Sequence, residues 1–510
     1  MRSEVLRIEK LVYREQGVTL LDNFNLNVFE GEIMGLLPIN NQGLTALLSL
    51  LRENKPLHFG YVYYREELLN TWRAPRPGYN RISVIQAEGC LVEGLTVADN
   101  IFVLRPGFKG RIMRPRLFRQ QLMPFLQSVG VSLSAEAYVE ELTIFERFVV
   151  ELLKAIVAGH RLIVIKDIST FVSERELHKL HAILRHFTRN GVSFLYVCVH
   201  FEEMIQICDR AALMMDGRVT KILQGSEMSF QSLLPYTEAY DQLVLRQMYR
   251  AAKSPGKTVF AAEHLTMERM DDLSFSVREG ECLVLQDLDN FFLSELIAVI
   301  SGERAPRQGR MLLDGRPFCP ARSRGIAVIP EMPTEKLLFM GMSYLENLCF
   351  TMDHRLPGIW RSRRIQKGMR MAYEDFVGAE QMDLRVDGLT EAEKYQLVYR
   401  RVMLQNPRVV FCVQPFRRAD VALRMSILKH LAAFLDRGIA VVILAVNLAD
   451  SLALADRLIR AESGRAREEY DKSHFASIPI SAPWIRLYQA EWEEARRMKR
   501  STDSAARPGG

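Results

Sequence analysis

The two halves of this chain repeat one another. Three segments recur at a constant shift of 247 positions, which leads from residue 94 to 341, from 142 to 389 and from 208 to 455. A fourth segment, 21–31, recurs as 270–280. Because a constant shift over most of a half is difficult to obtain by chance, we infer that both halves share one fold.

Apolar runs predict the class of that fold. Each half contains two short, continuously apolar strands separated by a helix, at 162–165 and 193–199 in the first half and at 409–413 and 439–446 in the second. The helix of the first half begins with a capping box at Ser173. Strands that are apolar on both faces and joined by helices predict an α/β fold, in which helices cover a parallel sheet.

The length of 510 residues exceeds that of one ordinary domain. Residues 226–257 have no partner in the repeat and include a Ser-Pro-Gly turn signal. We therefore expect four segments along the chain: a first domain at 1–225, a linker at 226–257, a second domain at 258–470, and a C-terminal helix with a basic tail at 471–510.

Composition indicates a cytoplasmic protein. The seven cysteines are scattered, and an odd number cannot all pair internally, which favours a reducing compartment. The N-terminus has no apolar signal segment, and the most apolar run, 439–449, is too short to span a bilayer. A formal net charge of +6 is typical of a solvated surface, and we expect no nucleic-acid partner.

An eight-residue loop at 38–45 follows an apolar strand and precedes a helix with apolar residues at helical spacing. Strand, eight-residue turn and helix form the layout of a phosphate-binding loop, which needs glycines, a lysine and a hydroxyl. Gly43 and Thr45 fit this pattern, whereas Pro38 replaces the first glycine and Leu44 replaces the lysine. The loop therefore has the shape of a phosphate site without its main charge.

The counterpart of this loop in the second half, 287–294, departs further from the pattern. Ser294 keeps the hydroxyl, and Leu293 stands at the lysine position. The carboxylates of Asp287 and Asp289 would lie where a phosphate binds, and we expect them to repel it.

In the order of its segments, the chain resembles the tandem ATP-binding subunit of ABC importers of the ribose, galactose and xylose type, over roughly residues 4–470. The segments that carry the resemblance are 21–33, 94–101, 202–218 and 456–464. The resemblance implies two tandem ABC-type nucleotide-binding domains of the P-loop NTPase fold, each with a parallel-core sheet and a helical subdomain. It also implies two composite ATP sites within an intramolecular pseudo-dimer, permease subunits in the membrane as partners, and a peripheral location at the inner face of that membrane.

The family's acidic strand end, Asp-Glu, supplies the magnesium ligand and the catalytic base. The first half has Lys166 and Asp167 there, and the second half has Gln414 followed by proline. Asp167 is thus the one candidate catalytic residue, and its side chain is shorter than the family's glutamate. Gln414 cannot act as a base.

The family's signature segment, Leu-Ser-Gly-Gly-Gln, opens a helix that faces the γ-phosphate. Here the two segments read Leu-Thr-Ile-Phe-Glu at 142–146 and Leu-Thr-Glu-Ala-Glu at 389–393, without glycines. The switch histidine is replaced by valine in both halves, at Val199 and Val446. The polar position after the second core strand is retained as Gln86 in the first half and is Glu331 in the second.

The candidate nucleotide-binding residues are degenerate equivalents of the family's site. They are Asn40, Gly43, Thr45, Gln86, Lys166 and Ser294. They leave ATP binding open at the first site only and make a role for Mg²⁺ doubtful. One alternative places the ammonium of Lys166 where Mg²⁺ normally sits; a solvent-facing lysine or an ion pair with Asp167 is the simpler interpretation.

Two further patterns have plain structural explanations that we favour. His178, His181 and His186 lie on one predicted helix, where a solvated face explains them better than a zinc site, so we expect no metal centre. A helix after Pro483 is predicted to pack back on the second half, rather than on a membrane or a partner.

Three functions follow in order of preference. We predict a catalytically degenerate pseudo-ATPase that acts as a scaffold or regulator with a carbohydrate-importer permease, because every catalytic element is altered while the frame survives. The alternative is a divergent but active ATP-binding and ATP-hydrolysing subunit of a sugar importer. A ribosome-acting tandem ABC protein fits poorly, because such proteins have intact signatures and a long charged linker.

Overall fold

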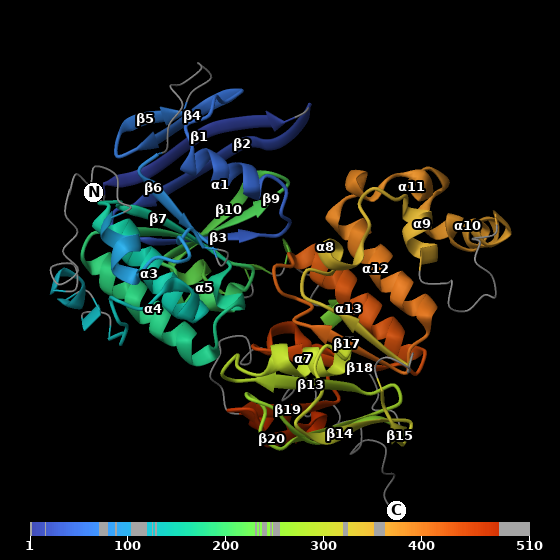
Figure 1. Ribbon diagram of the computed structural model, residues 1–510. Coiled ribbons are helices and arrows are strands. Elements are labelled where there is room, and N and C mark those ends of the chain that lie inside the picture. Colours follow the sequence, from blue (N-terminus) through green and yellow to red (C-terminus); the bar gives the residue numbers. More distant parts are fainter. Residues whose placement is uncertain are drawn as a thin grey trace, which may run out of the picture. The chain divides into compact units, whose positions relative to one another are not determined.

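The computed structural model describes most of the chain. The described residues are 3–15, 17–70, 80–86, 89–103, 120–124, 126–127, 130–229, 232–233, 235–236, 242–244, 247, 256–319, 325–350 and 363–478. They form two compact units, one from each half of the chain (Figure 1). The predicted helix after Pro483 and most of the predicted linker lie outside the described residues, and the predicted domain boundaries stay predictions.

The first unit contains two sheets. A four-stranded antiparallel sheet has the order β2-β1-β4-β5, with β1 at Glu4–Glu15, β2 at Val18–Phe29, β4 at Phe59–Tyr64 and β5 at Glu67–Asn70. A six-stranded sheet has the order β10-β9-β3-β8-β7-β6, with β3 at Ile33–Pro38, β6 at Ile82–Ile85, β7 at Leu162–Lys166, β8 at Ser193–Val197, β9 at Arg210–Met215 and β10 at Arg218–Gln224. Its strands are parallel except for β10, which pairs antiparallel with β9.

Helices connect the parallel strands of the first unit. They are α1 at Leu44–Arg52, α3 at Ile144–Val157, α4 at Glu174–Arg189 and α5 at Phe201–Ile207, with short turns η1 at Asp99–Val103, η2 at Val139–Glu141, η3 at Ile168–Thr170 and η4 at Gly225–Glu227. Helix α4 begins after Ser173, whose side chain and that of Glu176 form the predicted capping box. This helix start is therefore set by local chemistry that is visible in the sequence.

The second unit repeats both sheets. The antiparallel sheet has the order β12-β11-β14-β15, with β11 at Thr258–Thr266, β12 at Leu273–Arg278, β14 at Gln308–Leu313 and β15 at Arg316–Pro317. The six-stranded sheet has the order β16-β17-β18-β13-β19-β20, with β13 at Cys282–Asp287, β16 at Ile326–Ile329, β17 at Val409–Val413, β18 at Ala440–Ala445, β19 at Arg457–Glu462 and β20 at Arg465–Asp471. Strand for strand, this is the order found in the first unit, so the predicted duplication and the α/β fold with a parallel-core sheet in each half are confirmed.

A helical subdomain separates β16 from β17. The helices of the second unit are α7 at Leu293–Ser301, α8 at Pro333–Leu337, α9 at Tyr344–Cys349, α10 at Arg363–Val377, α11 at Ala379–Asp383, α12 at Glu391–Gln405 and α13 at Val421–Asp436, with short turns η6 at Val386–Gly388, η7 at Ala449–Ala453 and η8 at Lys472–Ser477. In the part of the chain that the structure describes, none of the helices has the length and apolar character needed to cross a bilayer.

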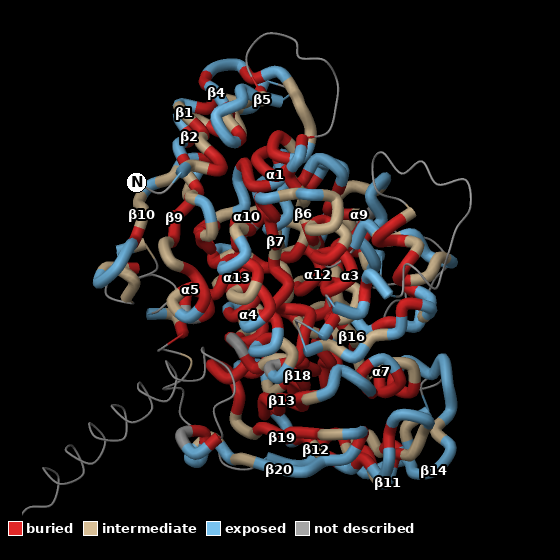
Figure 2. The backbone as a smooth tube through the Cα atoms, turned by 90° about the vertical axis from the view of Figure 1, so that its left-hand side faces the viewer, coloured by how far each residue is buried: buried red, intermediate tan, exposed pale blue. Residues whose placement is uncertain are grey.

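The central strands explain why the sheets form. All six residues of β3 and all six of β13 are buried; Figure 2 labels β13, where the tube has the colour of buried residues. In each unit, one apolar cluster joins the antiparallel sheet, the helix after the loop and the parallel sheet. This burial fixes the carboxyl end of the central strand, where the candidate site begins.

The repeat extends to single hydrogen bonds. In the first unit, Asn100 donates from Nδ2 to the carbonyl of Val92 (3.2 Å) and accepts from its N–H at Oδ1 (2.9 Å). In the second unit, Asn347 makes the same pair of bonds with Phe339, at 3.0 and 2.9 Å. Both asparagines are fully buried. In both halves, the segment that leads into the helical region is thus held by the same pair of hydrogen bonds between an asparagine side chain and the backbone.

His430 gives the second unit a predicted pH dependence. Its ring stacks on Tyr399 with 5.2 Å between ring centroids, and burial, followed by the nearby charges of Arg400 and Lys429, lowers its pKa from 6.5 to about 4. Because the pKa of His430 is lower in the folded than in the unfolded protein, the buried ring favours the neutral form. The contribution of His430 to the free energy of unfolding is therefore fully present above pH 6.5 and is lost as the pH falls toward 4. Calorimetry should show the unfolding temperature of the second unit decreasing over this range.

The matched control is His430→Phe, which keeps a stacked ring and removes the titration. It should show a smaller decrease in unfolding temperature between pH 6.5 and about 4 than the wild type. Equal decreases in both proteins would contradict a contribution from His430.

Candidate functional site

The predicted residues of the first half gather at one edge of its parallel sheet. Asn40, Gly43 and Thr45 follow β3, Gln86 follows β6, and Lys166 ends β7. These strands are parallel, so their carboxyl ends meet at a single edge. Ser294 begins the equivalent helix, α7, of the second unit.

Asn40 fastens the first loop to the turn between β9 and β10. Its Nδ2 donates to Oδ1 of Asp216 (2.8 Å), and its Oδ1 accepts from the N–H of Asp216 (3.1 Å). Both ends of the amide are therefore used inside the unit. Asn40 positions the loop, whether or not a ligand binds there.

Gly43 is required by close packing. It adopts a left-handed conformation, with φ of 78° and ψ of −11°. A Cβ at this position would lie 2.2 Å from the carbonyl oxygen of Leu20 and 2.8 Å from Cδ2 of Leu21. The glycine that matches the phosphate-loop pattern therefore has a structural reason of its own.

The next two residues differ in what they offer a ligand. Leu44, at the lysine position, is 2% exposed and belongs to the apolar cluster of the unit. Thr45 is exposed in the first turn of α1. The first loop thus presents a hydroxyl, while the position that normally supplies a cation packs into the core.

The strand end at Lys166 and Asp167 is partly buried. Asp167 is 8% exposed, has a left-handed φ of 51°, and donates its N–H to the carbonyl of Val197 (2.9 Å). Lys166, the last residue of β7, is half-buried. The residue at the candidate base position is therefore buried and has a left-handed backbone conformation.

Gln86 lines a small pocket against α3. The pocket has a volume of about 40 Å³, and its lining includes Glu93, Arg147 and Glu151. Glu151 accepts a hydrogen bond from the N–H of Cys90, and burial raises the pKa of its carboxyl group. This volume suits ordered water rather than a nucleotide.

In the second loop, Asp287 folds back into the loop itself. The residue is fully buried at the end of β13. Its Oδ2 accepts from the N–H groups of Phe291 (2.6 Å), Phe292 (2.8 Å) and Leu293 (3.4 Å), and its Oδ1 accepts from that of Asp289 (3.3 Å). Burial raises the pKa of the Asp287 carboxyl group, and the four N–H donors oppose that rise. Backbone N–H groups that a phosphate loop offers to phosphate are here bound by an internal carboxylate.

Asp289 has the same role as Asn40. Its Oδ2 accepts from the N–H of Ser463 at 2.8 Å, and Ser463 is the repeat partner of Asp216. Ser294 is exposed in the first turn of α7. The two aspartates of the second loop therefore have different roles, which sequence reasoning did not separate.

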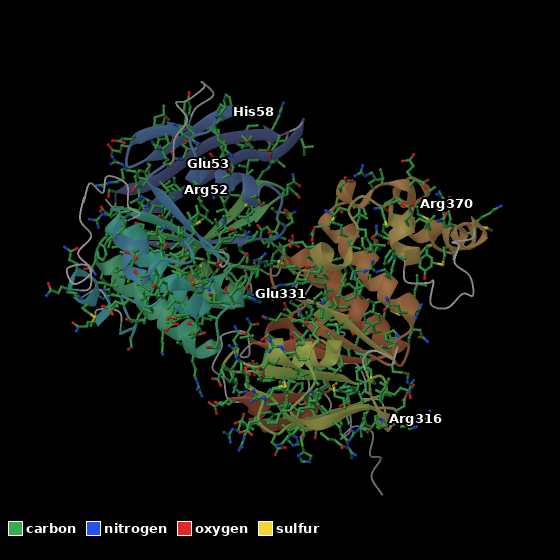
Figure 3. The ribbon with its side chains drawn as sticks, viewed as in Figure 1. Arg52, Glu53, His58, Arg316, Glu331 and Arg370 are labelled. Carbon is green, nitrogen blue, oxygen red and sulfur yellow. The ribbon has the colours of Figure 1, made fainter. Side chains whose placement is uncertain are left out.

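The polar position after β16 carries an ion pair. Glu331, labelled in Figure 3, pairs with Arg417, and their side chains are 23% and 11% exposed. Burial lowers the pKa of Arg417 to about 10, which the carboxylate of Glu331 opposes. Arg417 follows β17, the parallel neighbour of β16. Sequence reasoning missed this arginine; the signal was a glutamate at a glutamine position together with an arginine just after Gln414.

Both signature helices are capped by their own first turns. The Oγ1 of Thr143 accepts from the N–H of Glu146 (3.3 Å), and Oε2 of Glu146 accepts from the N–H of Thr143 (2.9 Å). Thr390 and Glu393 form the same box, at 3.4 and 2.7 Å. In each box the threonine hydroxyl thus satisfies the N–H of the third helical residue, and the glutamate carboxylate satisfies the N–H of the capping threonine.

A search of the described residues, those of the helix with three histidines included, finds no group of three or more His, Cys, Asp or Glu side chains placed to hold a metal ion. Nε2 of His181 lies 3.4 Å from Oε1 of the buried Glu203. His186 packs edge-on against Phe187.

No protein-family model matches the chain. Curated proteins, by contrast, match it in sequence. The ribose import ATP-binding protein RbsA of Geobacillus kaustophilus is 25% identical over 466 residues, which cover 88% of this chain and 92% of that protein. The xylose import ATP-binding protein XylG of Moorella thermoacetica is 24% identical over 505 residues, which cover 94% and 98%. The resemblance to ATP-binding subunits of sugar-type ABC importers is confirmed. It extends over nearly the whole chain, so both halves take part in it.

Among solved structures, the complex of archaeal ribosomal stalk protein aP1 with the archaeal ribosome recycling factor aABCE1 is similar over 91% of this chain and 90% of the matched chain. The TM-score is 0.58 and the sequence identity is 13%. At this identity the likeness shows the tandem fold alone.

Gly43→Ala should destabilise the first unit. The new Cβ meets the Leu20 carbonyl and also occupies a left-handed backbone position, so we expect a loss of about 1–3 kcal/mol in the free energy of unfolding. The control is Gly17→Ala, where φ is +84° and nothing lies within 4 Å of the added Cβ. Chemical denaturation that gives equal losses for both variants would contradict the packing requirement at Gly43.

The Glu331–Arg417 pair should show measurable coupling. A double-mutant cycle with Glu331→Gln and Arg417→Met is expected to give an interaction free energy of about 0.5–3 kcal/mol, because the pair is largely shielded from water. The control cycle uses Arg307 and Glu268 of the same unit, which are 61% and 64% exposed and should couple less. Equal coupling in the two cycles would refute a special role for the shielded pair.

Proposed function

We propose that the chain is a catalytically degenerate, ABC-type ATP-binding subunit that acts as a scaffold or regulator with a carbohydrate-importer permease. The observation that carries the proposal is the internal satisfaction of phosphate-binding donors. In the second loop, Asp287 takes four backbone N–H groups, and at both signature helices a glutamate completes a capping box.

The chemistry of phosphoryl transfer supports this proposal. Catalysis depends on a lysine at the β- and γ-phosphates, a metal ion, and preorganised donors around the transferred group. Leu44 and Leu293 occupy both lysine positions and are buried. Gln414 stands at the second strand end, where a carboxylate is needed. Little remains in either half that stabilises the charge that develops on the phosphoryl group.

The setting of the protein follows from its relatives. Ribose and xylose import proteins resemble the chain along nearly its entire length, and sugar import needs a membrane-embedded pathway. We therefore propose permease subunits as partners and a peripheral, cytoplasmic position on the membrane. We further propose that any ATP binding is confined to the first site, and that Mg²⁺ contributes little there.

One observation keeps an active ATPase as the second candidate. Thr45, Gln86, Lys166 and Asp167 lie at one edge of the first unit's sheet, which leaves a hydroxyl, an amide, a cation and a carboxylate together. In this alternative, Lys166 supplies the charge that the buried Leu44 cannot.

Nucleotide titration separates the two candidates. We expect the full chain to show no Mg²⁺-dependent ATP hydrolysis above that of an Asp167→Asn variant, because charge stabilisation is missing in both halves. Isothermal titration with ATP, with and without Mg²⁺, measures binding directly, and Lys166→Ala tests the first site. Turnover at rates typical of transporters, abolished by Asp167→Asn, would establish the active alternative. Absence of ATP binding both with and without Mg²⁺ would eliminate the active alternative.

A further inference from the structure

We propose that the carboxylate of Asp287 is the permanent occupant of the second loop, an internal substitute for a bound phosphate, and that its removal opens a site for a small free oxyanion. The inference deepens the proposed function and rests on it in one respect, namely that this loop does not serve as a nucleotide site in the natural protein.

The geometry is that of an occupied anion site. Three consecutive backbone N–H groups, from Phe291 to Leu293, point at one oxygen of Asp287, and a fourth donor, from Asp289, points at the other. Asn290, between the donors, has a left-handed φ of 52°. A left-handed residue in a turn directs successive N–H groups to one point, as in phosphate-binding nests.

The position of the loop adds to the attraction for an anion. The donors lie where β13 ends and the nine-residue helix α7 begins, so the positive end of the helix dipole faces the carboxylate. Asp287 is fully buried, and a buried carboxylate is stable only when it is paired or accepts several hydrogen bonds. The four N–H groups supply those bonds, so the loop and the carboxylate stabilise one another.

The first loop shows that this arrangement is not general to the fold. Its residue at the position of Asp287 is Pro38, which has no side-chain acceptor. Its αL residue is Gly43, whose counterpart Phe292 instead lies near the right-handed helical region, with φ of −112° and ψ of −13°. The carboxylate and the local backbone conformation therefore occur together in the second loop.

Chemical rescue tests the proposal in the full chain. Asp287→Gly removes the carboxymethyl group that acetate resembles and leaves the donors in place. We expect the N–H groups of 291–293 to exchange with deuterium roughly 10- to 100-fold faster in this variant, the change that corresponds to losing hydrogen bonds to a charged group. Acetate or inorganic phosphate should restore protection in a saturable manner, relative to chloride at equal ionic strength.

Two comparisons complete the design. The wild type should show no acetate-dependent protection at 291–293, because its site is filled. Asp289→Gly removes the same charge from the same loop, but it loses a bond to Ser463 rather than the α7 donors, so acetate should not rescue it. Equal responses to acetate in wild type, Asp287→Gly and Asp289→Gly would identify surface binding only and would overturn the proposal.

A folding failure does not remove the test. If Asp287→Gly does not fold, Asp287→Asn keeps the shape and one acceptor while it removes the charge, and its exchange at 291–293 should be faster than in the wild type. Unchanged exchange in Asp287→Asn, or full protection in a folded Asp287→Gly without added anion, would overturn the proposal. Failure of the proposed function would appear differently, as Mg²⁺-dependent ATP hydrolysis by the wild type.

Discussion

The first turn of a helix leaves backbone N–H groups without partners inside the helix. The candidate sites of this protein depend on which acceptors bind these N–H groups. In an ATP-binding cassette these donors face phosphate, after the central strand and at the signature helix. Here Asp287 binds the donors of the second loop, and Glu146 and Glu393 complete capping boxes at the two signature helices. A donor that is already bonded to an internal carboxylate gains little from an external phosphate. At these three places the backbone donors are therefore satisfied by side chains of the protein itself.

The packing and hydrogen bonds that form the frame do not depend on a bound nucleotide. The strands β3 and β13 are buried over their whole length, and each supports one apolar cluster. Gly43 is needed against Leu20, and Asn40 and Asp289 fasten their loops to backbone N–H groups across the sheet. Leu44 joins the apolar cluster at a position where the family has lysine. Residues that look like remnants of a binding site thus hold the fold together.

Much of the fold was predictable, and the site was predictable only in part. The constant shift of 247 positions and the continuous apolar runs indicated two α/β units, and the strand orders agree. The capping box at Ser173 was also correctly placed. By contrast, Asp287 was expected to repel a phosphate, and the structure places its carboxylate among the donors themselves. Arg417 was not anticipated as the partner of Glu331, because the two residues belong to different strand ends that only the parallel pairing of β16 and β17 brings together.

The sequence by itself determined the duplication, the buried strands, the helix starts and the presence of leucine at the lysine position of both loops. Each of these depends on the order, spacing or identity of residues along the chain, and hydrophobic burial and local capping act on that order directly. Only the tertiary structure decided which acceptor each backbone donor of the loops uses. That choice depends on the left-handed turn at Asn290 and on the burial of Asp287 at the end of β13. The same aspartate is a repulsive charge or a resident ligand according to where its oxygens lie, and spacing along a chain does not specify that position.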